Sequence, residues 1–426
     1  MRGLMRPTKD SSGIALFMVM GAISLLSMLV TEFTYVSQIS QKMAFDALDQ
    51  VKVQYIAKSG FKLSLLRLRA YQQVKGYLGK MDKAAAGAAV PKGLVDKIWS
   101  FPFIYPIPTN LPGLMPREKD EIDKFQKDSE LGGRYSALIE SESSKMNLNS
   151  ILASFAPGPS ASPSPTPKPS PDATPTPAPS FNPEEARKSL ADYMWNILNQ
   201  KFESDQQFAS EYRDFKIDEF VDTIVAWADR TYERKGSDSA DVVPMKRAPF
   251  TSVSELHMLP GMDDDLYSLL APALTASTTP GINVNTMKEN TLRALFPKIT
   301  DEEVKDFFKY RDADDQDNSF KDEEDFFKYI LKAITIFKGD QGEIDRFRQD
   351  LTRRNVRIVT DESEFKITVQ AQVNQSVRTL EAWVTLSTPE TPPKTPAPPA
   401  NPTNNDGKSA NPTLDTGLKI TFMRFI

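Results

Sequence analysis

The chain has 426 residues, a formal net charge of −5 and no cysteine. This mild charge does not indicate nucleic-acid binding, and the lack of cysteine excludes disulfides, thiolate metal sites and cysteine nucleophiles. The single histidine, His257, excludes a histidine-rich metal centre and is expected on a helix surface or in packing contacts. No nucleophile–base pair, phosphate-binding glycine loop or zinc pattern is present, so we expect no enzymatic activity.

A basic, polar leader precedes an apolar segment at the N-terminus. The leader contains Arg2, Arg6 and Lys9, whereas residues 14–30 carry no charge. As a helix, this segment would span about 25 Å at about 1.5 Å per residue. That length is slightly short but acceptable for one membrane crossing. The positive-inside rule then places the N-terminus in the cytoplasm and the chain after about Glu32 across the membrane.

An ordinary secretory signal peptide is the alternative for this segment. It fits less well, because no small-x-small cleavage pattern follows the apolar residues. Apolar residues instead continue at helical spacing through Phe33, Val36, Ile39, Met43, Leu48, Val51 and Tyr55. No proline interrupts residues 14–90. The sequence therefore predicts one helix from the membrane to about Gln73, and we assign a transmembrane and amphipathic helix to 14–75.

The middle of the chain predicts a strand, a linker and a helical domain. Residues 135–140 alternate like a strand within a first sheet-forming segment, 76–155. Residues 156–182 are rich in Pro, Ser and Thr and form an extended linker. Residues 183–340 are assigned to an all-α domain, because apolar residues recur there at helical spacing. Ser252 or Ser254 is expected to cap one helix, and Gly261 to end it.

The C-terminal third changes to a strand-like period. Three antiparallel strands are predicted at 357–360, 364–373 and 379–386, within a sheet segment assigned to 341–387. A second Pro/Asn-rich linker, 388–412, precedes a final strand in 413–426. The fold class is thus α+β: a long N-terminal helix and an antiparallel sheet, with a large all-α domain inserted in the chain.

Several motifs resemble one family. Gly13 followed by an apolar helix resembles a prepilin peptidase site, with a 1–13 leader cleaved between Gly13 and Ile14. Residues 55–61, 145–149 and 282–286 are similar to elements of the type II secretion minor pseudopilin K family (general secretion pathway protein K). Pilins normally carry Glu at the fifth mature position, which here is Met18. The loss of that carboxylate is characteristic of this family.

The resemblance implies a type IV pilin-like fold without a required cofactor. It implies a subunit at the tip of the pseudopilus, which helps to initiate and cap the filament for export of folded proteins across the outer membrane. The implied partners are minor pseudopilins I, J and H, the major pseudopilin, prepilin peptidase and the inner membrane. The implied location is the bacterial inner membrane, single-pass, with most of the chain periplasmic. The two proline-rich linkers depart from the family pattern.

An acidic loop is the best metal candidate. Asp312, Asp314 and Asp317 lie in it, and family members can bind calcium in the α-domain. Asp312, Asp314, Gln316 and Glu323 roughly follow a calcium-loop spacing, but Asp317 takes the place of the required glycine, so an EF-hand is not expected. A solvated acidic loop is the alternative. The family's Trp-x-Asp-x-Asp pattern is incomplete here, because Thr231 replaces its second Asp.

Two other functions stay open. Residues 259–262 and 283–286 also resemble helix-hairpin-helix units, which bind DNA backbones through glycine-rich turns and nearby cations. However, Asp263, Asp264 and Asp265 follow the turn at Gly261, and carboxylates repel a phosphate backbone. No nucleic-acid partner is therefore expected. The alternatives are a DNA-binding pseudopilin of a competence system and an adhesive minor pilin of a type IV pilus.

Overall fold

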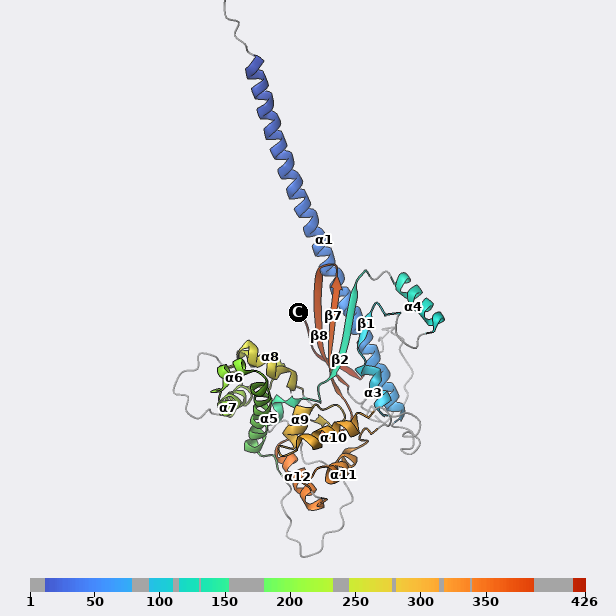
Figure 1. Ribbon diagram of the computed structural model, residues 1–426, viewed down its shortest axis with the longest axis vertical. Coiled ribbons are helices and arrows are strands. Elements are labelled where there is room, and N and C mark those ends of the chain that lie inside the picture. Colours follow the sequence, from blue (N-terminus) through green and yellow to red (C-terminus); the bar gives the residue numbers. More distant parts are fainter. Residues whose placement is uncertain are drawn as a thin grey trace, which may run out of the picture.

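The first described element is one long helix, and only its second half buries side chains. The computed structural model describes residues 12–78, 92–109, 115–129, 132–152, 180–232, 245–277, 281–313, 318–337, 339–386 and 417–426. Helix α1 (Ser12–Leu78) is unbroken and extends far from the rest of the protein (Figure 1). Thr31 and Thr34 donate hydrogen bonds to the carbonyls four residues earlier, so their hydroxyls need no outside partner.

A five-stranded antiparallel sheet packs against the second half of α1. Its order is β1-β2-β7-β8-β9. The strands are β1 (Phe103–Tyr105), β2 (Arg134–Ser141), β7 (Glu364–Val373), β8 (Ser376–Leu386) and β9 (Leu418–Phe425). The alternation predicted for β2 is observed, because every second side chain along it is buried. The predicted strands β7 and β8 and the final strand β9 are confirmed.

The sheet and α1 share one core. Phe365, Ile367 and Val369 point from β7 toward α1 and are fully buried, as are Val53 and Leu68 on α1. Helix α3 (Lys92–Ser100) closes this core, where Trp99 packs edge-to-face against Phe365. The sequence did not predict α3, β1 or helix α4 (Pro116–Asp128), which is exposed along its length.

The helical domain is inserted between β2 and β7 and lies at the end of the sheet away from the N-terminus of α1 (Figure 1). Its first group contains α5 (Pro183–Ser204), α6 (Gln206–Tyr212), α7 (Ile217–Ala228), η3 (Val253–Met258), α8 (Asp264–Leu270) and η4 (Ala271–Ala273). Its second group contains α9 (Glu289–Leu295), α10 (Asp301–Arg311), α11 (Glu323–Ala333) and α12 (Gln341–Arg353).

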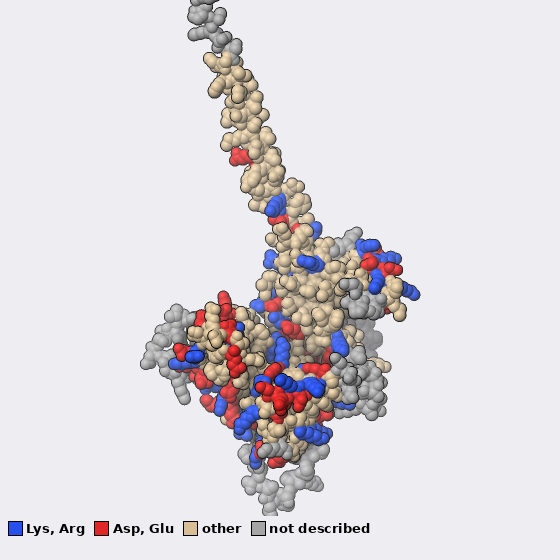
Figure 2. Space-filling view, in the orientation of Figure 1, with Lys and Arg blue, Asp and Glu red and all other residues tan. Residues whose placement is uncertain are grey.

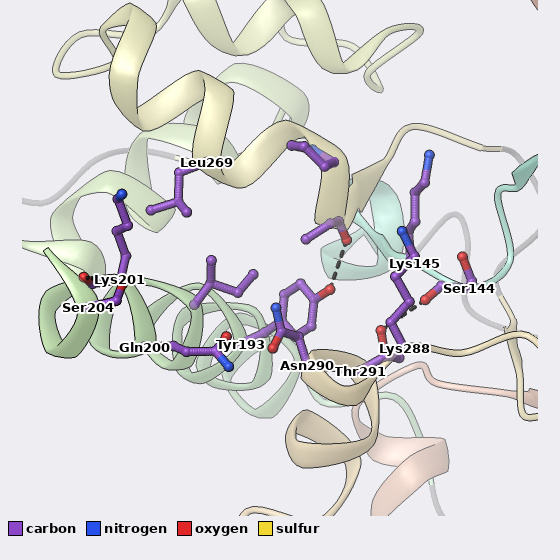
Figure 3. A pocket seen from close by; sticks show the side chains of 13 residues that line it. Ser144, Lys145, Tyr193, Gln200, Lys201, Ser204, Leu269, Lys288, Asn290 and Thr291 are labelled. Carbon is purple, nitrogen blue, oxygen red and sulfur yellow. Dashed lines mark hydrogen bonds between the residues drawn. The ribbon is translucent and has the colours of Figure 1, made fainter. Parts of the chain in front are cut away.

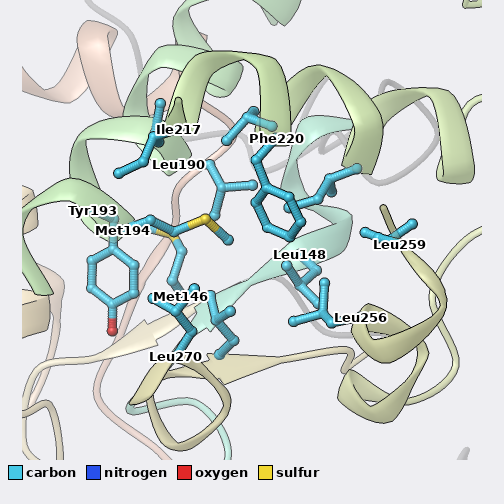
Figure 4. Packing of buried hydrophobic residues seen from close by; sticks show 14 of the residues in the cluster. Met146, Leu148, Leu190, Tyr193, Met194, Ile217, Phe220, Leu256, Leu259 and Leu270 are labelled. Carbon is cyan, nitrogen blue, oxygen red and sulfur yellow. The ribbon is translucent and has the colours of Figure 1, made fainter. Parts of the chain in front are cut away.

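Each helical group has a hydrophobic core of its own. In the first group, Leu190 and Met194 of α5 meet Phe220 of α7 and the short η1 helix (Leu148–Ile151) that follows the sheet (Figure 4). The second core is built on phenylalanines, including Phe307, Phe320 and Phe326, all almost fully buried. Ser252 caps η3 and Glu255 completes a capping box, which confirms one of the two caps considered from the sequence.

Two expectations for the C-terminal third are wrong. The sheet segment does not begin at 341, because Gln341–Arg353 forms α12 and buries Ile344 and Leu351 in the second helical core. The segment 357–360 adds no strand to the main sheet. Its two central residues form β6 (Ile358–Val359), which pairs in parallel with β5 (Ile282–Asn283). A similar pair joins β3 (Met146–Asn147) to β4 (Leu274–Thr275).

Candidate functional site

The first half of α1 is an apolar surface on which none of the described residues packs. Its most apolar window has a mean hydropathy of 2.3 and no side chain buried inside the protein. By length and composition this helix can cross a membrane. Figure 2 shows it as a nearly uncharged rod, in contrast to the mixed charges of the other domains. Phe17 is 82% exposed, so this surface needs lipid or neighbouring helices to cover it.

The two residues of the predicted processing site, and Met18, lie in the first turns of this helix. Gly13 and Ile14 both belong to α1, so the predicted cleavage site falls inside the helix. A Cβ added to Gly13 would meet no atom within 4 Å. Met18, which the resemblance places at the position of the pilin carboxylate, is exposed. Residues 1–11 of the leader lie outside the described residues. Cleavage and the role of Met18 stay predictions.

The structure describes only part of the acidic loop. Asp312 follows α10, and Arg311 donates to its two carboxylate oxygens over 2.7 and 3.0 Å. Asp314 and Asp317 lie outside the described residues. Among the residues that are described, no group of three His, Cys, Asp or Glu side chains is placed to hold a metal ion. Calcium binding by Asp312, Asp314 and Asp317 stays a prediction, and Asp312 would first have to exchange its arginine partner.

A part-buried carboxylate, Glu255, contacts the tryptophan of the incomplete Trp-x-Asp-x-Asp pattern and is paired with a lysine. Lys246 Nζ contacts the two Glu255 oxygens at 2.9 and 2.8 Å and the Pro249 carbonyl at 2.8 Å. Trp227 Nε1 donates to the same carboxylate over 3.0 Å. Burial alone would raise the pKa of Glu255, but hydrogen bonds from Lys246, Thr251 and Trp227 lower it to about 2. The Lys246 ammonium therefore already neutralises the Glu255 carboxylate.

The turn that resembles a DNA-binding hairpin is built from structural contacts. Gly261 has a φ of 87°, which favours glycine. The Asp263 carboxylate caps α8 and accepts the Tyr212 hydroxyl over 2.7 Å. His257 packs against Tyr267 with ring centres 3.8 Å apart and the rings tilted by 33°, which agrees with the packing role expected for it. None of these contacts places a Lys or Arg side chain where it could bind a phosphate.

Two similar Asn-x-Asn turns fasten the helical groups to the sheet. In each turn the first asparagine accepts the amide N–H of the second: Asn147 from Asn149 over 2.9 Å, and Asn283 from Asn285 over 3.0 Å. The second asparagine then binds both backbone polar groups of a distant phenylalanine. Asn149 does so with Phe250, and Asn285 with Phe320. Each turn begins at the last residue of a two-residue parallel strand. The pairs β3–β4 and β5–β6 thus join the chain before each helical group to the chain after it.

A buried carboxyl lies where these turns meet the sheet. Glu362 is 1% exposed and accepts hydrogen bonds from Ser143 Oγ (2.7 Å), Asn283 Nδ2 (3.2 Å), the Glu364 N–H (3.2 Å) and the Ser141 hydroxyl. Burial raises its pKa, and these donors oppose the rise only in part. Sequence reasoning missed Glu362, because nothing in its neighbourhood in the chain distinguishes it from the exposed acidic residues.

Glu362 gives the stability of the protein a predictable pH dependence. Its pKa is higher in the folded than in the unfolded chain, so the folded state holds the proton more tightly. The stabilisation that Glu362 provides by holding this proton is fully present below the ordinary glutamate pKa. It is lost as the pH rises through the raised pKa of the folded state. We expect the free energy of unfolding to fall over that range in urea titrations, and Glu362→Gln to flatten the fall. The exposed Glu302→Gln is the matched control. An equal slope in the wild type and Glu362→Gln would contradict the assignment.

Comparison with known proteins finds likeness to solved structures only. No family model and no curated protein matches the chain. The structure is similar to a chain of the GspK–GspI–GspJ complex from the type 2 secretion system of enterotoxigenic Escherichia coli, with a TM-score of 0.47 and 15% identity. The match covers 89% of this chain and 98% of that one. The predicted α+β architecture, a long N-terminal helix and an antiparallel sheet with an inserted helical domain, is present in the elements described above.

Proposed function

We propose that this chain is a minor pseudopilin of a type II secretion system, related to the pseudopilin K family, with a structural and non-catalytic role. One observation carries the proposal. A single unbroken helix is exposed and apolar along its first half and buried beneath an antiparallel sheet along its second half. This division suits a subunit that is held in the inner membrane, N-terminus in the cytoplasm, and later packs its helix into a filament.

A position at the tip of the pseudopilus is supported by two further features. The helical domain lies beyond the end of the sheet that is farther from the membrane-spanning half of α1 (Figure 1). A domain of this size above the sheet would obstruct stacking of a further subunit. Met18 also lacks the carboxylate that pilin subunits carry at this position. In this role the chain helps to initiate and cap the filament for export of folded proteins across the outer membrane.

The proposed partners follow from the same role. They are minor pseudopilins I, J and H, the major pseudopilin, and the prepilin peptidase that removes residues 1–13. The GspK–GspI–GspJ complex is named for a joint assembly of three such subunits, and we propose a similar assembly here. DNA uptake and adhesion remain the alternatives, and the carboxylates around Gly261 disfavour the first.

Deletion of the gene for this chain in its own host tests the proposal. The account expects exported proteins to accumulate, folded, in the periplasm, and the full chain supplied in trans to restore their release. The same strain should take up DNA and adhere normally, and the purified chain should not retard DNA in a low-salt gel. Normal protein export combined with lost DNA uptake would overturn the proposal in favour of a competence pseudopilin.

A further inference from the structure

A cleft of about 380 Å³ opens where the two helical groups meet (Figure 3). Helix α5 and the segment from α8 to η4 form two of its sides, and the start of α9 and the turn at Ser144 and Lys145 form the others. Its floor is largely apolar and includes Ile197, Leu269 and Pro272. Lys201 and Leu269 lie on one side in Figure 3 and Lys145 on the other, with Tyr193 between them.

Three lysines line this cleft, and among the residues described around it no carboxylate does. Two of these lysines are neutralised. Lys145 Nζ lies 2.5 Å from the buried Glu142 carboxylate, and Lys201 Nζ lies 2.9 Å from Asp205. Lys288 is the third. Across the described ranges it has no ion-pair partner, although Glu289 is next to it in the chain.

The carboxylate of Glu289 is already engaged, which leaves the Lys288 charge available. Arg293 binds Glu289 at 2.8 Å and also Asp301 at 2.7 Å, so both acidic groups close to α9 are committed to this arginine. Gln200 and Asn290 bring two side-chain amides to the same cleft. Neither amide has a hydrogen-bond partner in the described part of the chain. One free ammonium and two amides therefore border an apolar floor.

We propose that this cleft binds a carboxylate carried on a short apolar body. Lys288 would pair with the carboxylate, the Gln200 and Asn290 amides would donate to it, and the apolar part would lie on Ile197 and Leu269. A charge-assisted hydrogen bond is about twice as strong as a neutral one, which makes Lys288 the main anchor. One uncompensated ammonium matches a monoanion, and the apolar floor disfavours a free phosphate. Such a carboxylate can belong to a free aliphatic acid or to the C-terminus of a peptide.

Calorimetry on the full chain in lipid nanodiscs, with empty nanodiscs as the blank, tests this inference. The probes are hexanoate and acetyl-alanyl-leucine, which distinguish a free acid from a peptide terminus. Hexanamide and acetyl-alanyl-leucinamide are their neutral counterparts. We expect at least one carboxylate to bind, and its amide to bind at least tenfold more weakly. Binding of both carboxylates, or of either one alone, supports the inference and identifies the source.

Lys288→Glu should weaken binding of the carboxylate at least tenfold, and Lys288→Arg should restore most of it. Lys288 is exposed, so neither change is expected to disturb folding. Lys298→Glu is the matched control: an exposed lysine just beyond α9 that does not line the cleft, where a change below twofold is expected. The inference is overturned if neither carboxylate binds, if the amides bind equally well, or if Lys288→Glu has no larger effect than Lys298→Glu.

Discussion

A Gly60→Leu substitution should disrupt the packing of the sheet against α1 and lower the free energy of unfolding. Gly60 faces the sheet, and a Cβ added there would lie 2.7 Å from Val369 Cγ1 and within 2.9 Å of two ring atoms of Tyr135. These neighbours are buried parts of β7 and β2 and cannot move away freely, because protein interiors are close-packed. Overpacking costs about 1–3 kcal/mol, and a leucine at this contact should cost about 3 kcal/mol or more of the free energy of unfolding.

Gly76→Leu is the matched control in the same helix, because a Cβ there meets nothing within 4 Å. It should leave stability unchanged or raise it by up to about 1 kcal/mol through helix propensity. Hydrogen exchange can locate the effect: Gly60→Leu should accelerate exchange in β2 and β7, whereas α5 and α9–α12 keep most of their protection. Equal protection of β7 in the two variants would show that the close contact at Gly60 does not hold the sheet.

The sequence predicts best where the physical signal is local. Helix α1 follows from the absence of proline and from continuous apolar spacing, and β2 follows from the alternation predicted at residues 135–140. Helix α12 carries a local signal too, because Ile344, Phe347 and Leu351 recur at helical spacing. A domain boundary at 340 lies four residues before that stripe begins and therefore places the helix in the sheet segment.

The junction between the sheet and the helical domain could not be predicted in the same way. The Asn-x-Asn turns were recognised as motifs, but their hydrogen-bond partners Phe250 and Phe320 lie 101 and 35 residues away. Strand β6 is two residues long and pairs in parallel, so it leaves no periodicity to detect. Glu362 is buried only because two segments that are far apart in the chain close over it.

Maturation at Gly13 is the second large effect that we expect. Gly13→Val should block removal of the leader almost completely, because the resemblance implies that the prepilin peptidase requires glycine before the cleaved bond. The structure makes this test specific: a Cβ at Gly13 meets nothing within 4 Å, so the substitution need not disturb folding. Gly21→Val is the matched control, since Gly21 lies in the same apolar helix and is equally unobstructed.

Under the proposed function, this chain is processed and assembled as a pseudopilin. The most direct measurement is the intact mass of the chain purified from cells with active prepilin peptidase. The account predicts a mature chain that begins at Ile14 in the wild type and in Gly21→Val, and an uncleaved chain in Gly13→Val. A wild-type chain that keeps its leader, or one cut after the apolar segment as a secretory signal peptide would be, would contradict the account.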